Sequence, residues 1–339
     1  MLLKIRSIVP ACCVALIIGA ASFAGIGAPR VIAQISTESV AEKSLNVLFI
    51  GNSYTGRHNL ADVVRTLAEE GHPGLSFRPS TVIYGGRTLA DHWRLGTQNI
   101  VKLHSLTRSA QEATIASLRK TRLMNPDDGH ARSALTRHRK LLEGLKAERP
   151  TWDVVVLQSY RDDLKGDASL YAEYAPKFAR LAKAQGARVI LYVTTPTTQN
   201  AEPLKTPPDA GSVMKKTREI AALANRIDAA VAPMSLAGLR CQTQRPDLTL
   251  RFINDAHLNQ TMAYLTACTL YAAIFDRSPE GLSVDSVTDI RFLDNDRANR
   301  NKDRDGNPIT RRFDDKDRTD LQRIAWESHV EFQKMHGKQ

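Results

Sequence analysis

The chain has 339 residues, of which 42% are hydrophobic and 24% charged, as in a globular protein with one large domain or two small ones. Its formal net charge of +11 would suit an anionic polymer or an acidic lipid surface. No DNA- or RNA-binding motif accompanies this charge, so we expect a basic solvated surface and no nucleic-acid partner.

The first 33 residues have the pattern of a signal peptide for export. Two basic residues precede an uncharged stretch at residues 8–28, and Val31-Ile32-Ala33 offers small or apolar residues for cleavage. We therefore expect an exported protein, periplasmic or secreted, in which residues 34–45 form a linker. The alternative is an uncleaved segment that contacts or anchors in a membrane, since about 20 apolar residues suffice to span a bilayer.

Short apolar runs then alternate with longer helical stretches. The runs are typical of buried strands, and the stretches between them carry apolar residues at a spacing near 3.6. This alternation implies βαβ units and a mostly parallel sheet covered on both faces, which is a three-layer α/β domain. The expected strands are 46–51, 81–84, 153–157 and 188–193, and the expected helices are 59–70, 170–185, 213–230 and 262–275.

Residues 97–149 interrupt the alternation. They are helical in propensity and rich in Lys, Arg and His, and they are longer than one crossover requires. The segment Asn125-Pro126-Asp127-Asp128-Gly129 is a turn signal that would divide them into two parts. We predict a helical insertion over one edge of the sheet.

Residues 279–339, the C-terminal extension, are densely charged and end in a predicted amphipathic helix at 319–335. Within the extension, residues 301–306 copy the first half of a calcium loop. Arg312 stands where such a loop needs a bidentate Glu, so a plain turn is the better prediction.

Cys241 and Cys268 are the cysteines that follow the predicted signal. They could form a disulfide in an oxidising compartment. Cys268 lies in an apolar helical pattern, so a buried free thiol is an equal alternative. Two cysteines this far apart do not form a metal motif.

A serine follows the first predicted strand, in Gly51-Asn52-Ser53. Ligand sites in open α/β sheets form at the carboxyl ends of strands, where a serine after a small turn can expose its hydroxyl. A plain turn or a helix cap would use the same residues.

A histidine beside a carboxylate precedes the last predicted helix of the sheet domain, in Asn254-Asp255-Ala256-His257. Such a histidine can take the proton of a serine if a carboxylate orients its ring. Asp255 is the carboxylate beside this histidine. A surface histidine without a catalytic role is the plain alternative for His257.

Two further blocks follow other predicted strands. Gly85-Gly86-Arg87-Thr88 follows the second strand, and Gln158 ends the third. The N–H group of Ser53, a glycine N–H of the first of these blocks and the amide of Gln158 would together form an oxyanion hole. Each block alone also suits an ordinary turn or strand end.

These four blocks, in this order, resemble the SGNH hydrolases, a branch of the GDSL-like esterases and lipases. Gly51-Asn52-Ser53 corresponds to the family's Gly-Asp-Ser block, Gly86 to its oxyanion glycine, and Gln158 to its Asn. Asn52 and Gln158 are similar to a subgroup with Gly-Asn-Ser and Leu-Gln, with which His92-Trp93 also agrees. The family's Asp-x-x-His offset falls on Asn254, whereas Asp255 is two residues before the histidine. Asp255 is our choice for the group that orients His257, with Asn254 or a backbone carbonyl as alternatives.

The resemblance implies a flavodoxin-like three-layer sandwich at residues 46–278 and a serine esterase that needs no metal or organic cofactor. Ser53 would carry the acyl group, and His257 would act first as base and then as acid. Export suggests a short-chain acyl ester of a small molecule or glycan, such as acetylated carbohydrate. The alternatives are a polysaccharide O-acyltransferase and a carbohydrate-binding module with a decayed triad.

Overall fold

The computed structural model describes residues 43–146, 149–161, 165, 168–194 and 198–337, all within one compact unit, Val40–Gln339. The predicted signal peptide and residues 34–42 of the predicted linker lie outside these residues, whereas residues 43–45 of that linker are the start of the first strand. In the described part of the chain, no helix combines the length and the apolar character needed to cross a bilayer.

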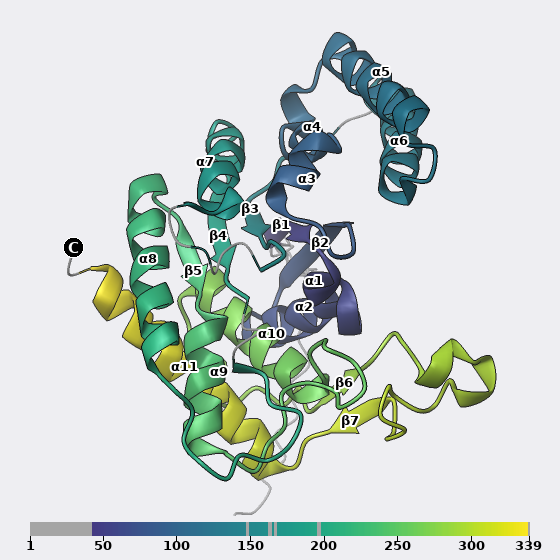
Figure 1. Cartoon of the computed structure of the whole chain (residues 1–339). Helices are drawn as coiled ribbons and strands as arrows, with labels where there is room; N and C mark the ends of the chain where they lie inside the picture. Colours follow the sequence, from purple (N-terminus) through teal and green to yellow (C-terminus); the bar gives the residue numbers. More distant parts are fainter. Residues whose placement is uncertain (1–42, 147–148, 162–164, 166–167, 195–197, 338–339) are drawn as a thin grey trace, which may run out of the picture. The chain divides into compact units, whose positions relative to one another are not determined.

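Five parallel strands form the central sheet in the order β2-β1-β3-β4-β5 (Figure 1). The order is that of flavodoxin-like sheets, in which the chain changes direction between β1 and β3. The predicted parallel sheet is confirmed, and its ligand-binding crevice is expected at the carboxyl ends of β1 and β3. The strands are β1 (Lys43–Gly51), β2 (Leu75–Ile83), β3 (Val154–Leu157), β4 (Arg188–Tyr192) and β5 (Ala230–Ala232).

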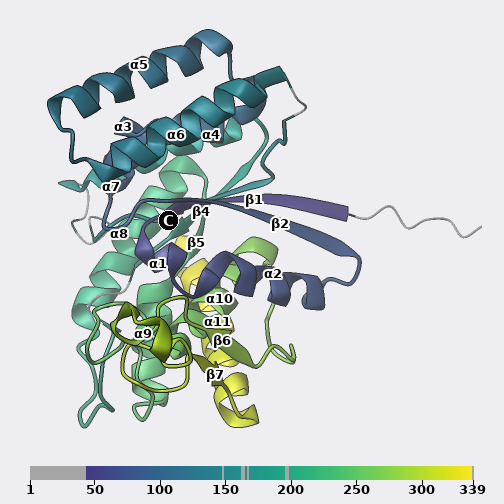
Figure 2. The same cartoon turned by 90° about the vertical axis from the view of Figure 1, so that its right-hand side faces the viewer.

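The strands are apolar on both faces because helices cover both sides (Figure 2). Successive side chains alternate, so that Val47 and Phe49 enter one core and Leu48 and Ile50 the other. The first core contains α2 (Leu60–Gly71), α9 (Met234–Gln244), α10 (Gln260–Phe275) and most of α11 (Asp315–His336). The second contains α3 (Leu89–Arg94), α4 (Thr97–Val101), α7 (Leu170–Lys183) and α8 (Gly211–Ile227).

The predicted helical insertion is present. After the 3₁₀ turn η2 (Leu103–Ser105), helices α5 (Arg108–Met124) and α6 (Gly129–Glu143) pack against each other, and η3 (Gly144–Lys146) follows. The predicted turn connects them, because Asp128 caps α6 by accepting the N–H of Ala131 at 2.9 Å. Arg137 of α6 donates to the Tyr84 hydroxyl at 2.8 Å, which joins the insertion to the end of β2.

The C-terminal extension packs into the same unit, so the expected boundary after residue 278 does not divide the described structure. Leu321 and Ile324 of α11 lie in the core beside α10. The helix begins at Asp315, earlier than predicted, because Asp314 caps it by accepting the N–H of Asp317 at 2.7 Å. The extension also contains β6 (Ser286–Thr288), the turns η7 (Leu293–Asn295) and η8 (Arg297–Asn299), and β7 (Thr310–Arg312), which pairs antiparallel with β6.

Two features depart from the local prediction. The helix expected at 213–230 ends at Ile227, where Asp228 adopts a left-handed conformation with φ of 49°, and β5 and α9, which were not predicted, follow it. Cys241 and Cys268 are both buried free thiols, so the disulfide alternative is wrong.

Candidate active site

Ser53 is the first residue of α1 (Ser53–Gly56), directly after β1. Asn52 caps this turn, since its Oδ1 accepts the N–H of Tyr54 at 2.9 Å. The Asn52 amide nitrogen donates to the carbonyl of Arg87 at 3.3 Å. Asn52 therefore ties the Ser53 turn to the loop that contains Gly86.

The structure brings Ser53, His257 and Asp255 together. His257 Nε2 lies 2.8 Å from Ser53 Oγ, and His257 Nδ1 makes a short contact with Asp255 Oδ1. Because the carboxylate accepts the Nδ1 hydrogen, Nε2 is left to accept the hydroxyl hydrogen of Ser53. This is the arrangement in which a serine can act as a nucleophile.

Asp255, and not Asn254, supports the histidine. Its Oδ1 also accepts the backbone N–H of His257 at 3.1 Å, which turns the carboxylate back over its own loop. The two-residue offset therefore brings the carboxylate to the ring. Asn254 is exposed, and its backbone N–H donates to Asp305 at 3.0 Å.

Two arginines lie against Asp255. Arg57 donates to Asp255 Oδ2 at 3.0 Å, and Arg304 Nε forms an ion pair with the same oxygen at 3.5 Å. Burial by itself would raise the pKa of Asp255, but hydrogen bonds and charges from His257 and Arg57 hold this pKa well below its ordinary value. Asp255 is therefore ionised at neutral pH and can stabilise a positively charged His257.

Gln158 has a different role from the one expected. Its side chain is fully buried, and its Oε1 accepts the N–H of Asn52 at 2.8 Å and the hydroxyl of Thr55 at 3.1 Å. Its amide nitrogen donates to the carbonyl of Ser159 in a short contact. A Cβ at Gly51 would lie 2.6 Å from Gln158 Oε1, so the glycine makes room for this packing. Gln158 thus supports the Ser53 turn from beneath.

Two backbone N–H groups remain as candidates for the oxyanion hole. Ser53 is the first residue of a helix, so its N–H has no intrahelical acceptor. Gly86 is exposed with φ of +64°, a left-handed conformation that favours glycine, and its N–H has no hydrogen-bond partner within the described residues. Both groups are therefore available to a ligand.

No protein-family model matches this chain, and no curated protein matches it significantly. A solved structure described as a candidate SGNH hydrolase from Slackia heliotrinireducens is 20% identical, with a TM-score of 0.43 over 68% of this chain and 100% of that one. TesA is 15% identical, with a TM-score of 0.36 over 68% of this chain and 98% of its own. A candidate acylhydrolase from Bacteroides fragilis is also 15% identical, with a TM-score of 0.32 over 68% and 85%. Such distant likenesses say nothing of activity.

His92, from the His-Trp pair, supports the Ser53 turn from the side of α3. Its Nε2 lies 3.0 Å from the carbonyl of Gly51, and its Nδ1 lies 3.1 Å from the hydroxyl of Thr97. Burial lowers the pKa of His92 to about 4, so the ring is neutral at pH 7. Because a carbonyl can only accept, Nε2 carries the hydrogen and Nδ1 accepts from Thr97.

The buried neutral ring predicts a pH-dependent stability. In the unfolded chain His92 takes up a proton near pH 6.5, whereas the folded chain takes it up near pH 4. Its contribution to stability is therefore complete above pH 6.5 and is lost as the pH falls toward 4. We expect His92→Gln to reduce the slope of the free energy of unfolding between pH 4.5 and 6 by up to about 1.4 kcal/mol per pH unit. Urea unfolding measured across this range checks it, and a slope equal to that of the wild type would contradict it.

A polar cleft of about 660 Å³ opens beside the Gly86 loop, against the turn between α5 and α6. Its lining mixes cationic, anionic and amide side chains, including Arg87, Arg94, Asn125, Asp127, Asp128 and His130. Arg94 pairs with Asp128 at 3.1 Å. Arg87 Nε is buried and has no hydrogen-bond partner among the described residues. The cleft therefore offers donors and acceptors one residue away from the candidate oxyanion glycine.

Sequence reasoning missed Arg57 and Arg304, which contact Asp255, and Asp289, which pairs with Arg57. Arg57 could have been noted, because it is a cation four residues after the candidate nucleophile at the start of a helical pattern. Asp289 and Arg304 lie in the charged extension, where no local pattern sets them apart from their neighbours.

Proposed function

We propose that this protein is a serine ester hydrolase of the SGNH type. The observation that carries the proposal is the contact of 2.8 Å between Ser53 Oγ and His257 Nε2, with Asp255 on the other side of the ring. The order of the four sequence blocks supports the same reading. The intact arrangement speaks against a decayed triad that only binds carbohydrate.

The reaction follows from these contacts. His257 takes the proton as Ser53 Oγ attacks the acyl carbon, and Asp255 stabilises the resulting imidazolium. The N–H groups of Ser53 and Gly86 would stabilise the negative oxygen of the tetrahedral intermediate. His257 then protonates the leaving alcohol, which leaves an acyl-enzyme on Ser53. Water repeats the sequence and releases the acid.

The proposed substrate is a short-chain acyl ester of a glycan or another polar alcohol. The polar cleft beside Gly86 supports a polar alcohol, since its mixed donors and acceptors suit hydroxyl groups. The signal-like pattern of residues 1–33 supports export, to the periplasm or the exterior. The experiment below distinguishes hydrolysis from transfer of the acyl group to a sugar.

The test combines a fluorophosphonate probe, a short-chain acyl ester and an acetylated glycan. We expect the probe to label Ser53, as located by mass spectrometry of the digested protein, and acid to be released from both esters. Acylated sugar formed with added acceptors would identify an acyltransferase. Sugar binding without labelling or turnover would show a binding module and overturn the proposal.

Arg87 provides a separate prediction about the alcohol part of the substrate. If its side chain contacts the alcohol in the cleft, Arg87→Gln should raise KM for an acetylated glycan by about tenfold, the effect of one lost hydrogen bond to a charged group. A small phenyl ester, which does not reach the cleft, should keep its KM. Arg119→Gln on the exposed face of α5 is a suitable control. Equal losses for both esters would contradict this use of the cleft.

A further inference from the structure

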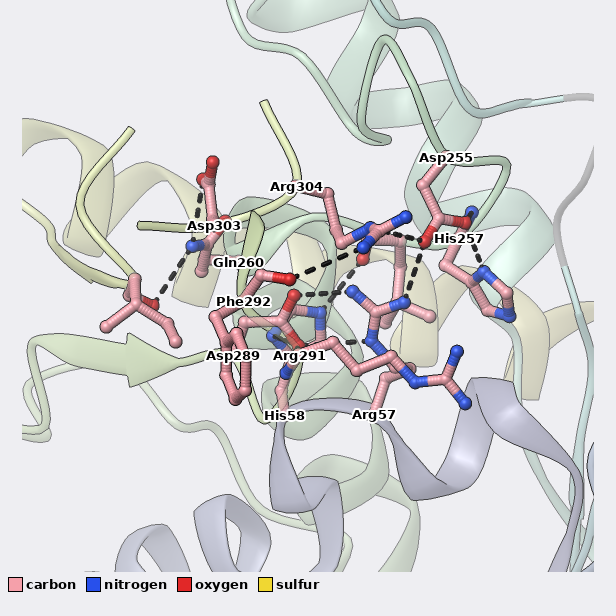
Figure 3. Close-up of polar contacts among 12 residues, drawn as sticks. Arg57, His58, Asp255, His257, Gln260, Asp289, Arg291, Phe292, Asp303 and Arg304 are labelled. Atoms are coloured by element: carbon pink, nitrogen blue, oxygen red, sulfur yellow. Dashed lines mark hydrogen bonds and ion pairs between the residues drawn. The ribbon is translucent and has the colours of Figure 1, made fainter. Parts of the chain in front are cut away.

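Arg57 lies between two carboxylates that come from different parts of the chain (Figure 3). Its side chain is 1% exposed. Nη1 donates to Asp255 Oδ2 and Nε donates to Asp289 Oδ1, both at 3.0 Å. Nη2 makes a short ion pair with Asp289 Oδ2. A buried guanidinium is costly without such partners, so each carboxylate is part of what keeps Arg57 in place.

Asp255 and Asp289 share the N–H groups of Arg57. Asp289 occupies two N–H groups of Arg57 in a bidentate pair, and Asp255 receives a hydrogen bond from one nitrogen, on Oδ2. Oδ1 of Asp255 is then left for His257. Without the charge of Asp289, Arg57 would be free to pair more fully with Asp255 and compete with the imidazole.

Asp289 itself is fixed within the C-terminal extension. Its side chain is fully buried, its backbone N–H donates to the carbonyl of Ile309 at 2.9 Å, and its Oδ1 accepts the N–H of Arg291 at 3.2 Å. Arg304, from the same extension, donates to the carbonyl of Phe292 at 3.3 Å and presents its Nε to Asp255. Both residues are therefore held by the extension and not by the sheet.

Residues 301–306, the segment that copies half of a calcium loop, bind the loop at residues 253–257. Asp305 accepts the backbone N–H groups of Ile253 at 2.8 Å and Asn254 at 3.0 Å, directly before Asp255. Asp303 Oδ1 accepts the N–H groups of Asp305 and Asn307 at 2.9 and 3.0 Å and so builds the turn. The carboxylates of this segment thus bind backbone N–H groups.

We propose that the C-terminal extension completes the active site, with Asp289, Arg304 and Asp305 as positioning residues that act through Arg57 and the 253–257 loop. This inference rests on the proposed function, because it assigns the extension to the same Ser53–His257 centre. The extension supplies an anion, Asp289, that acts on Asp255 through Arg57, and a cation, Arg304, that pairs with Asp255 directly. An extension that only wrapped the surface would supply neither.

The signs of the two charges make the proposal testable. Hydrolysis needs a neutral His257, so the acidic limb of the pH profile of kcat/KM follows protonation of its ring. Removing the negative charge of Asp289 makes protonation less favourable, and removing the positive charge of Arg304 makes it more favourable. Burial lowers the pKa of His58, which faces Asp289, to about 4, and burial raises the pKa of Tyr54, beside the ring, above its ordinary value. Both side chains therefore stay neutral at neutral and mildly acidic pH.

The experiment compares the pH profiles of Asp289→Asn and Arg304→Gln in the full chain with that of the wild type. We expect the acidic limb to move to lower pH in Asp289→Asn and to higher pH in Arg304→Gln, by about half a pH unit or more. We also expect kcat to fall by about 10- to 100-fold in Asp289→Asn, because the orientation of Asp255 is loosened. Asp289→Glu keeps the charge and should keep the limb near its wild-type position.

Matched controls are Asp315→Asn, whose carboxylate is 91% exposed, and Arg312→Gln, whose side chain is 76% exposed. Both should leave the limb in place. Lower thermal stability with an unmoved limb in Asp289→Asn and Arg304→Gln would show a purely structural extension and overturn the inference.

A second readout separates this inference from the proposed function. The ring of His257 can be titrated by NMR in the wild type and both variants, with the signal assigned from His257→Gln, and this needs no substrate. Opposite shifts in a protein that hydrolyses no ester would overturn the proposed function and keep the positioning by the extension. If the His257 titration is the same in the wild type and both variants while the protein hydrolyses esters, the positioning by the extension is wrong and the proposed function stands.

Discussion

Replacing Ser53 by alanine is expected to lower kcat/KM for a short-chain acyl ester by about 10,000-fold or more, because no other group can carry the acyl intermediate. The measurement is the initial rate of ester hydrolysis together with labelling by a fluorophosphonate probe. Labelling should be abolished along with turnover. The thermal midpoint should change little, because the hydroxyl of Ser53 bonds only to His257 among the described residues.

A suitable control is Ser133→Ala on the exposed face of α6, where the hydroxyl donates to the carbonyl of Gly129 at 3.0 Å. This variant should keep both rate and labelling. If Ser53→Ala retains the wild-type rate and is still labelled, the nucleophile is a different residue, and the proposed reaction at this site is wrong.

Asp255→Asn is the second substitution for which we expect a large effect, a loss of about 1,000- to 10,000-fold in kcat. An amide in place of the carboxylate can donate to Nδ1 and thereby favour the wrong tautomer of His257, and it no longer stabilises the imidazolium. Asparagine is preferable to alanine, because it keeps the shape next to the buried Arg57. That guanidinium still retains Asp289 as a partner.

Asn254→Ala is the matched control for this prediction. Asn254 is exposed, and the hydrogen bond it makes to Asp305 comes from its backbone N–H, so its side chain should be dispensable and kcat should stay within about threefold of the wild type. Steady-state kinetics of both variants at the same pH decide between the two neighbours. A larger loss in Asn254→Ala than in Asp255→Asn would assign the support of His257 to Asn254.

Much of the sheet domain was predictable from local pattern. The apolar runs at β1, β3 and β4 and the helical spacing at α2, α7 and α10 identify a parallel sheet with two covered faces, because burial on both faces leaves near-continuous apolar strands. β5 escaped detection since its three residues, Ala230–Ala232, have the apolar character of the helix before them. Element type was therefore readable where a run was long and bounded by turn residues.

Ser53, Asp255 and His257 were predictable for a related reason. Each follows or precedes a recognisable element, and parallel strands bring their carboxyl ends to one edge of the sheet. The sequence left Asp255 and Asn254 undecided, because the choice depends on how the 253–257 loop turns its side chains. It also could not show that Gln158 Oε1 would accept hydrogen bonds from Asn52 and Thr55, since these contacts depend on the space left by Gly51.

The sequence by itself determined the parallel α/β architecture, the candidate nucleophile and its base, because these are encoded by local periodicity and by residues at strand ends. Only the tertiary structure decided which charges contact Asp255 and its partner Arg57. Arg57 and Asp289 are 232 positions apart and meet because β6, in the extension, packs against residues 57–59. Contacts at such separations depend on the packing of whole elements. In a charged segment, the local sequence does not indicate which carboxylate will be buried.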